Sequence, residues 1–248
     1  MIANIHILDL LIILGAIQGL IFAIYLWMKP LSNQKSSLFL SIFICSFALN
    51  SLYFTSESIG LRSHFDVWSF LPFYCSLLIV GSFYFFVFFL IHPHRKFKAA
   101  NWLVLLPGIL QIIYHFILMI WVLIDRDYLL SHSNFIYTMS DVIDIAVVIM
   151  TIVVLVFIIK MIHQYQHKLL DHFSEIEDFS LNWLKTLIYA MIAIFILFTI
   201  PVLYEVLTDH RMVNIYYPLW ISSSLMILRI KLPFLGTLKS TMNYFSLL

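Results

Sequence analysis

The sequence predicts an all-α membrane protein with seven transmembrane helices, its N-terminus outside the cell and its C-terminus in the cytoplasm. Three observations lead to this prediction. The chain of 248 residues is 62% hydrophobic, 17% aromatic and only 11% charged. Apolar stretches of about 20 residues, the length that crosses a bilayer, recur along it. Basic residues gather in alternate connections between those stretches. A water-soluble domain of this length could not bury so much apolar surface.

The first three helices are expected over residues 7–28, 36–55 and 68–91. The first apolar run is too long for the core of a signal peptide and has no basic segment before it, so we expect it to remain as a helix. The second is shorter and contains several serines. The third is the clearest, because no charged residue lies between Asp66 and Arg95.

The remaining helices are expected over residues 101–124, 139–160, 181–205 and 212–230. Ser174 and Glu177 form a capping box that defines a helix start before the sixth helix. Trp183 follows this box as an anchor at the membrane interface, which makes the three residues candidates for cytoplasmic coupling. One transmembrane domain then covers residues 1–231, and residues 232–248 form a short cytoplasmic tail.

The distribution of basic residues predicts the orientation. With seven helices, 11 lysines and arginines fall on the side of the odd-numbered loops and the C-terminus, and three fall on the other side. Cytoplasmic loops carry the excess of basic residues, so the first side is cytoplasmic. A miscounted helix would have exchanged the sides of all later charges and blurred this difference. The chain is therefore predicted to cross a membrane several times.

Several functions are excluded by composition and spacing. The basic residues are scattered and the net charge is +1, so no nucleic-acid-binding surface is expected. Cys45 and Cys75 lie within apolar runs, where a thiol behaves as a small hydrophobic side chain. His163 and His167 have the spacing of metal ligands, but no HExxH pattern accompanies them. The sequence therefore predicts no enzyme, cofactor or metal site.

The best candidates for ligand binding are ionisable groups at membrane depth. Asp141 and Asp144 are three residues apart, on one face of the outer end of the fifth helix, and Tyr204 and Glu205 lie near the outer end of the sixth. If these faces meet, they form an acidic pocket open to the outside, to which Asp9 could contribute, and which would suit a cationic or amine-bearing ligand. The alternative is that the carboxylates merely end helices at the interface, Asp141 as an N-terminal charge.

Single polar residues inside the other helices are expected to form hydrogen bonds between helices. Gly15 and Gly19 flank a glutamine at a spacing that lets a second helix approach closely. The expected packing and polar-core residues are Gly15, Gln18, Gly19, Asn50, Gln111 and His115.

Several short motifs resemble the seven-helix N-terminal membrane region of bacterial regulators, common in Bacteroidetes-type bacteria, that end in an AraC-type helix-turn-helix domain. The motifs are residues 15–23 (GAIQGLIFA), 33–35 (NQK), 173–184 (FSEIEDFSLNWL), 215–220 (IYYPLW) and 231–234 (KLPF). The resemblance spans nearly the whole chain and implies a signal-sensing region that crosses the bacterial cytoplasmic membrane several times. Related regions also precede histidine kinases, and no DNA-binding domain follows the last helix, so the output would be a partner or a domain outside these 248 residues.

Three functional hypotheses follow. The first is a receptor that detects an outward-side or membrane-borne ligand and passes the signal to a cytoplasmic output domain or partner protein. The second is a small transporter or channel with a path lined by Asp144, Glu205, Gln111 and His115. The third is a membrane effector or scaffold that acts by forming homo-oligomers in the lipid bilayer.

Overall fold

The computed structural model describes residues 7–30, 33–60, 70–98, 101–125, 131–172, 189 and 192–193. Within these ranges the secondary structure is helical and contains no strand. The helices are α1 (Ile7–Met28), α2 (Gln34–Ser58), α5 (Ser76–Ile91), α6 (Trp102–Ile124) and α8 (Ser133–His172). Segments within α1, α2, α6 and α8 are each long and apolar enough to cross a membrane. The predicted all-helical membrane protein is therefore confirmed for the described part of the chain.

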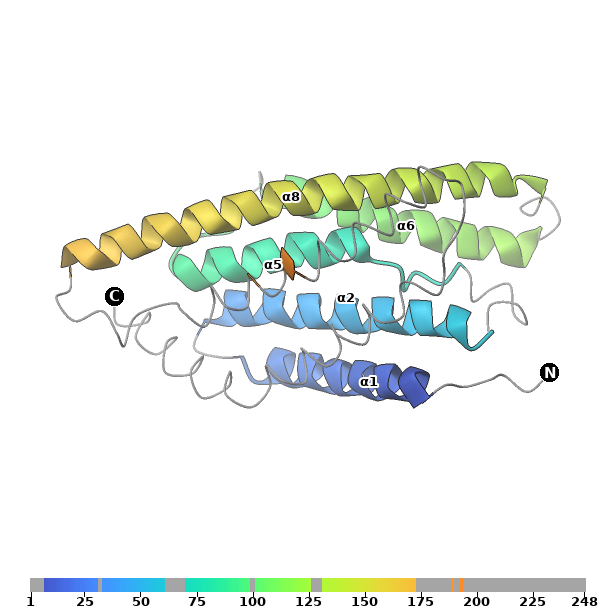
Figure 1. The fold of residues 1–248 in the computed structure, drawn as a ribbon, viewed down its shortest axis with the longest axis horizontal. Helices are drawn as coiled ribbons and strands as arrows, with labels where there is room; N and C mark the ends of the chain where they lie inside the picture. Colours follow the sequence, from blue (N-terminus) through green and yellow to red (C-terminus); the bar gives the residue numbers. More distant parts are fainter. Residues whose placement is uncertain are drawn as a thin grey trace.

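The five helices run up and down through one layered bundle (Figure 1). Helix α1 packs on α2, α2 packs on α5, and α5 also packs on both α6 and α8. Successive helices run in opposite directions, so the connections alternate between the two ends of the bundle (Figure 1). We call the end where α1 and α5 finish the basic end, because it holds Lys29, Lys35, Arg95, Lys96 and Lys98.

The opposite end, where α1 begins and α6 finishes, is the acidic end. It holds Asp9 in the first turn of α1, Asp125 after α6 and Asp141 in the first part of α8. The two ends thus differ in charge among the side chains that the structure describes.

Small residues bring α1 and α2 together. Ala16 and Ala23 are buried, and a Cβ atom at Gly19 would lie 3.4 Å from the Cβ of Ala48. The Ser41 hydroxyl donates a hydrogen bond of 2.7 Å to the Ala23 carbonyl. The contact therefore combines close backbone approach with a hydrogen bond, as is typical of helices that pack in lipid.

Two residues of α1 that were expected to take part in helix packing lie outside the contact between α1 and α2. Gly15 is only half-buried, and Gln18 is exposed, on a face directed away from α2. The small residues that face α2 are Ala16, Gly19 and Ala23, which are three and four positions apart. The described residues therefore give Gln18 no place in the seam between α1 and α2.

Helix α5 is the centre of the bundle. It contributes buried aromatic side chains to the core, among them Phe85, Phe86 and Phe89, each at most 1% exposed. The rings of Phe85 and Phe89 also pack against Phe39 of α2, with centroids 5.0 and 5.6 Å from it. A helix that is apolar on all sides must be surrounded by other elements, and α2, α6 and α8 surround this one.

At the basic end, polar side chains from the start of α2 close the end of α5. The Asn33 side chain accepts a hydrogen bond of 3.1 Å from the Lys35 backbone and donates one of 2.5 Å to the Phe89 carbonyl. The Lys35 ammonium donates to the Arg95 carbonyl at 2.7 Å. A helix leaves its last carbonyls without partners, and a cation favours the negative end of the helix dipole. These contacts fix α2 against α5.

Helix α8 is longer than the predicted 139–160 segment. It has 40 residues, which corresponds to about 60 Å, and it contains neither glycine nor proline. The hydrocarbon core of a bilayer is only about 30 Å thick. Figure 1 shows α8 continuing past the other helices at the basic end. The segment around His163 and His167 is therefore a continuation of this helix.

The other expected helices agree with the structure to different degrees. Helix α1 has the predicted bounds, and α2 and α6 lie close to theirs. The predicted 68–91 helix begins later, at Ser76. Of the 181–205 segment, residues 189, 192 and 193 are described and helical, and Ile192 packs against the core around α5. The 212–230 segment lies outside the described residues.

Candidate functional site at the start of helix α5

Helix α5 begins inside the bundle, well away from its acidic end. With 16 residues it is about 24 Å long, less than the thickness of the hydrocarbon core. Its second residue, Leu77, donates a backbone hydrogen bond of 2.9 Å to the side chain of Gln111. Helix α6 continues from Gln111 to Ile124, about another 20 Å toward the acidic end. Figure 1 shows α5 stopping short of its neighbours on that side.

A proline precedes the late start of the third predicted helix. Pro72 disfavours helical backbone at the residue before it, and residues 70–75 form turns and irregular backbone. The Phe73 amide instead donates a tight hydrogen bond of 2.7 Å to the Leu71 carbonyl. Non-helical backbone at membrane depth is tolerated where protein surrounds it or water reaches it. We call this non-helical segment, residues 70–75, the break, and it is the first feature that points to a functional site.

The first turn of α5 is completed by a neighbouring helix. Cys75 at the N-cap position makes no side-chain capping bond, although its carbonyl accepts from Leu78 and Ile79 at 3.1 and 3.2 Å. The backbone amide of Leu77, in the same first turn, donates its hydrogen bond to the Gln111 side chain of α6. A buried amide without a partner costs about 1–3 kcal/mol, so Gln111 secures the position at which α5 begins.

A second buried amide side chain reaches the same turn from α2. The Asn50 side-chain nitrogen donates to the Ser76 hydroxyl at 3.5 Å. Asn50 and Gln111 are both only 3% exposed. The Asn50 side-chain oxygen and the Gln111 side-chain nitrogen have no hydrogen-bond partner within the described part of the chain. Each amide therefore keeps one polar atom available beside the start of α5.

Tyr74 joins the break to α8. Its hydroxyl donates a short hydrogen bond to a carboxylate oxygen of Asp144. Its ring lies 5.2 Å from the ring of Tyr53 on α2 and 5.5 Å from His115 on α6, centroid to centroid. One side chain in the non-helical segment thus contacts three helices.

His115 lies one turn beyond Gln111 on α6. It is 6% exposed, and its Nδ1 lies 2.9 Å from the Gln111 carbonyl oxygen. With this nitrogen next to a carbonyl, the proton belongs on Nδ1. The ring then meets Tyr74 edge to face, at an interplanar angle of 62°. His115 therefore packs beside the phenol that holds Asp144.

The structure brings together four residues that the sequence marked for separate reasons: Asn50, Gln111, His115 and Asp144. We call these, with Tyr53, Tyr74, Ser76 and Leu77, the break site. Tyr53, Tyr74 and Ser76 were not selected from the sequence. The available signal was Pro72, two positions before Tyr74.

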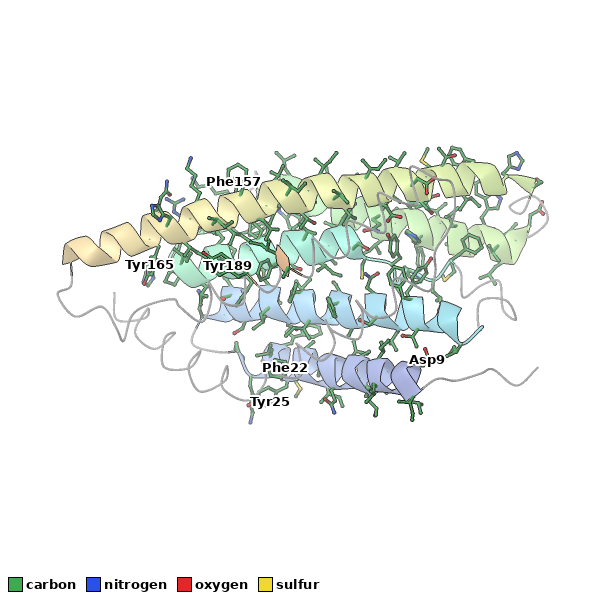
Figure 2. All side chains as sticks on the ribbon, in the orientation of Figure 1. Asp9, Phe22, Tyr25, Phe157, Tyr165 and Tyr189 are labelled. Carbon is green, nitrogen blue, oxygen red and sulfur yellow. The ribbon has the colours of Figure 1, made fainter. Side chains whose placement is uncertain are left out.

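The other acidic residues of the predicted pocket do not all join this site. Asp141 is exposed on α8. Asp9 is fully buried on α1, and Figure 2 shows it on the opposite side of the bundle from Phe157 of α8. Tyr204 and Glu205 lie outside the described residues, as do Ser174, Glu177 and Trp183. Asp144 is thus the described carboxylate that forms part of the break site.

The chemistry that the break site offers is hydrogen bonding and charge. It offers a carboxylate, two amide groups and aromatic rings within a largely apolar bundle. In a low-dielectric surrounding such groups interact strongly with a matching ligand. No group of three or more potential metal ligands occurs among the residues that the structure describes.

Comparison with known proteins gives no match: no protein-family model, curated protein or solved structure was found to be similar to this chain.

Proposed function

We propose that the chain is a receptor-like sensing region that binds its signal at the break site and passes it to a cytoplasmic output through α8. The observation that carries this proposal is that one unbroken helix contains Asp144 and also extends past the basic end of the bundle. The helix therefore provides a direct mechanical link between the site and the opposite membrane face.

The link is stiff. The distance along α8 from Asp144 to His163 is about 28 Å. Helices bend sharply at proline, at glycine pairs or at bulges, and α8 has no proline or glycine. A ligand that favours one position of Asp144 therefore shifts the inner part of α8 with it. Such a ligand acts by binding one arrangement of the helices more tightly than the other.

The proposal takes the basic end as the cytoplasmic end. Lys29, Lys35 and three basic residues in 95–98 lie there, and the described acidic residues of α1, α6 and the first part of α8 lie at the other end. This separation supports the positive-inside orientation, with the N-terminus outside. Seven helices in the bacterial cytoplasmic membrane remain part of the proposal, and the break site then faces the outer half of the bilayer.

The output is a cytoplasmic domain or partner protein that reads the position of α8. The short motifs that resemble membrane-bound AraC-type regulators support transcriptional control as that output. In the same proposal, the connection between α8 and the next helix, which contains Ser174 and Glu177, forms the coupling surface. The chain itself binds no nucleic acid.

Transport is the second candidate, and the break in α5 favours it. Discontinuous helices that begin at membrane depth hold substrates in many transporters. A pH-sensitive dye inside liposomes that contain the protein would reveal proton movement. Movement through the wild type that disappears in Asp144→Leu would replace the receptor proposal with a proton-coupled transporter.

The receptor proposal is tested by measuring the position of the inner part of α8. Spin labels at Lys29→Cys and His163→Cys, both exposed, report the distance between α1 and α8 in a background with Cys45→Ala and Cys75→Ala. Asp144→Leu removes the contact with Tyr74. We expect this variant to shift the mean distance by about 1–2 Å, the size of helix shifts in allosteric transitions.

Asp141→Leu is the matched control, because Asp141 is exposed on the same helix. Its distance distribution should match that of the unchanged protein. Identical distributions for Asp144→Leu and the unchanged protein would contradict coupling between the site and α8.

A further inference from the structure

We infer that the break site binds an organic amine that also carries a hydroxyl or carbonyl group. This inference rests on the proposed function only for the location of the site, and it adds the chemical class of the ligand. It follows from which polar atoms are engaged at the start of α5 and which are available.

The two available amide atoms lie beside adjacent residues. Asn50 is bonded to Ser76 and Gln111 to Leu77, whose Cα atoms are about 3.8 Å apart. The available atom of Asn50 is a hydrogen-bond acceptor and that of Gln111 is a donor. A matching ligand therefore presents one donor, for Asn50 on α2, and one acceptor, for Gln111 on α6.

The side-chain oxygen and nitrogen of Gln111 cannot exchange positions. Its oxygen accepts from the Leu77 backbone, so reversal would place an NH₂ group against an N–H donor. The available atom of Gln111 is thus a donor in any arrangement that keeps the start of α5. This requires an acceptor, such as a hydroxyl or carbonyl oxygen, on the ligand.

The donor of the ligand is best supplied by an ammonium group. Asp144 brings a carboxylate to the site, and Tyr53 and Tyr74 bring aromatic rings, whose faces attract cations. The phenol of Tyr74 donates to one oxygen of this carboxylate. Hydrogen bonds between an ammonium and a carboxylate are roughly twice as strong as neutral ones.

A metal ion fits this site less well than an amine. Calcium takes 6–8 oxygen ligands and magnesium six in a strict octahedron. The break site provides one carboxylate, and it provides rings where a metal would need further oxygens. An amine uses one charged contact, one neutral acceptor and the ring faces.

Calorimetric titration of the full chain in phosphatidylcholine nanodiscs tests this inference with three probes. The first is 2-amino-1-phenylethanol, which has the amine, the hydroxyl and a ring. The second is 2-phenylethylamine, which lacks the hydroxyl, and the third is 1-phenylpropan-1-ol, in which a methyl group replaces the amine. Empty nanodiscs correct for partitioning of each probe into lipid.

We expect the first probe to bind best. Loss of the hydroxyl should weaken binding several-fold, and loss of the amine about tenfold or more. Asp144→Asn keeps the shape of the side chain and should abolish the preference for the two amines over the alcohol. Asp141→Asn, the exposed control, should bind all three probes as the unchanged protein does.

Three results would overturn the inference: no binding of the amino alcohol beyond empty nanodiscs, equal binding of the alcohol without the amine, or an unchanged preference in Asp144→Asn. These results are separate from the test of receptor coupling. If Asp144→Leu moves α8 but no amine binds, the ligand class is wrong and the receptor proposal stands. If the amine binds but does not move α8, the site stands and the receptor proposal fails.

Discussion

Gly108→Ala is expected to lower the free energy of unfolding by about 3 kcal/mol, the upper part of the usual range for overpacking. A Cβ atom at Gly108 of α6 would lie 2.7 Å from both the Cα and the backbone nitrogen of Leu78 on α5. Backbone atoms cannot rotate away as a side chain can, so α5 and α6 must separate. Gly81 makes the reciprocal approach, with a Cβ position 3.0 Å from the Val104 carbonyl oxygen.

Gly19→Ala provides the matched control for this prediction. Its added Cβ would meet the Cβ of Ala48 at 3.4 Å, an ordinary contact. Because alanine favours helix over glycine by up to about 1 kcal/mol, this variant should be as stable as the unchanged protein or more so. Unfolding in mixed micelles of increasing SDS content, followed by circular dichroism, measures both variants. Equal stability of the two variants would show that α5 and α6 do not cross closely at Gly108.

Gln111→Leu is expected to destabilise the protein by about 1–3 kcal/mol, because it leaves the Leu77 amide without a partner in an apolar surrounding. The same titration in SDS measures the loss. Leucine is close to glutamine in size, so the effect comes from the missing acceptor and not from a cavity. The start of α5 should fray, which would appear as faster hydrogen exchange of the first-turn amides.

Gln18→Leu makes the same substitution at an exposed glutamine of α1. It should leave stability unchanged within about 0.5 kcal/mol, as surface substitutions usually do. If both glutamine variants lose the same stability, the buried capping role of Gln111 is contradicted.

The helices of the described region could largely be predicted from the sequence because their cause is local. An apolar run of membrane-spanning length between charged or polar residues defined α1 at the observed bounds, Ile7 and Met28. The same argument placed α6, which begins one residue later than expected. It gave 139–160 as the membrane-spanning part of α8, and the helix extends beyond this segment at both ends, from Ser133 to His172.

The late start of α5 was the main error in the predicted fold. Residues 68–75 carry no charge and are mostly aromatic or aliphatic, so a run defined by its flanking charges includes them with the helix that follows. Pro72 is a local signal, but transmembrane helices tolerate proline when neighbouring groups satisfy the freed backbone. Whether α5 continues through Pro72 or begins after it depends on Gln111, a partner 34 residues away from Leu77.

Four of the eight residues of the break site could be predicted from the sequence, but the way in which the site is assembled could not. Burial of a polar group in an apolar helix marked Asn50, Gln111, His115 and Asp144 individually. Their meeting depends on packing between four helices, for which the sequence has no local signal. Tyr74 was missed because a tyrosine near an expected helix end is normally an interface residue.

A double-mutant cycle between Tyr74 and Asp144, measured as the distance between labels at residues 29 and 163, tests the central claim most directly. The two side chains are linked by one hydrogen bond, and we propose that this bond sets the position of α8. Tyr74→Phe and Asp144→Leu should each shift the distance, and the double variant should shift it no further than the larger single effect. Shifts that add in the double variant, or no shift in Tyr74→Phe, would contradict the claim that the break site controls α8 through this contact.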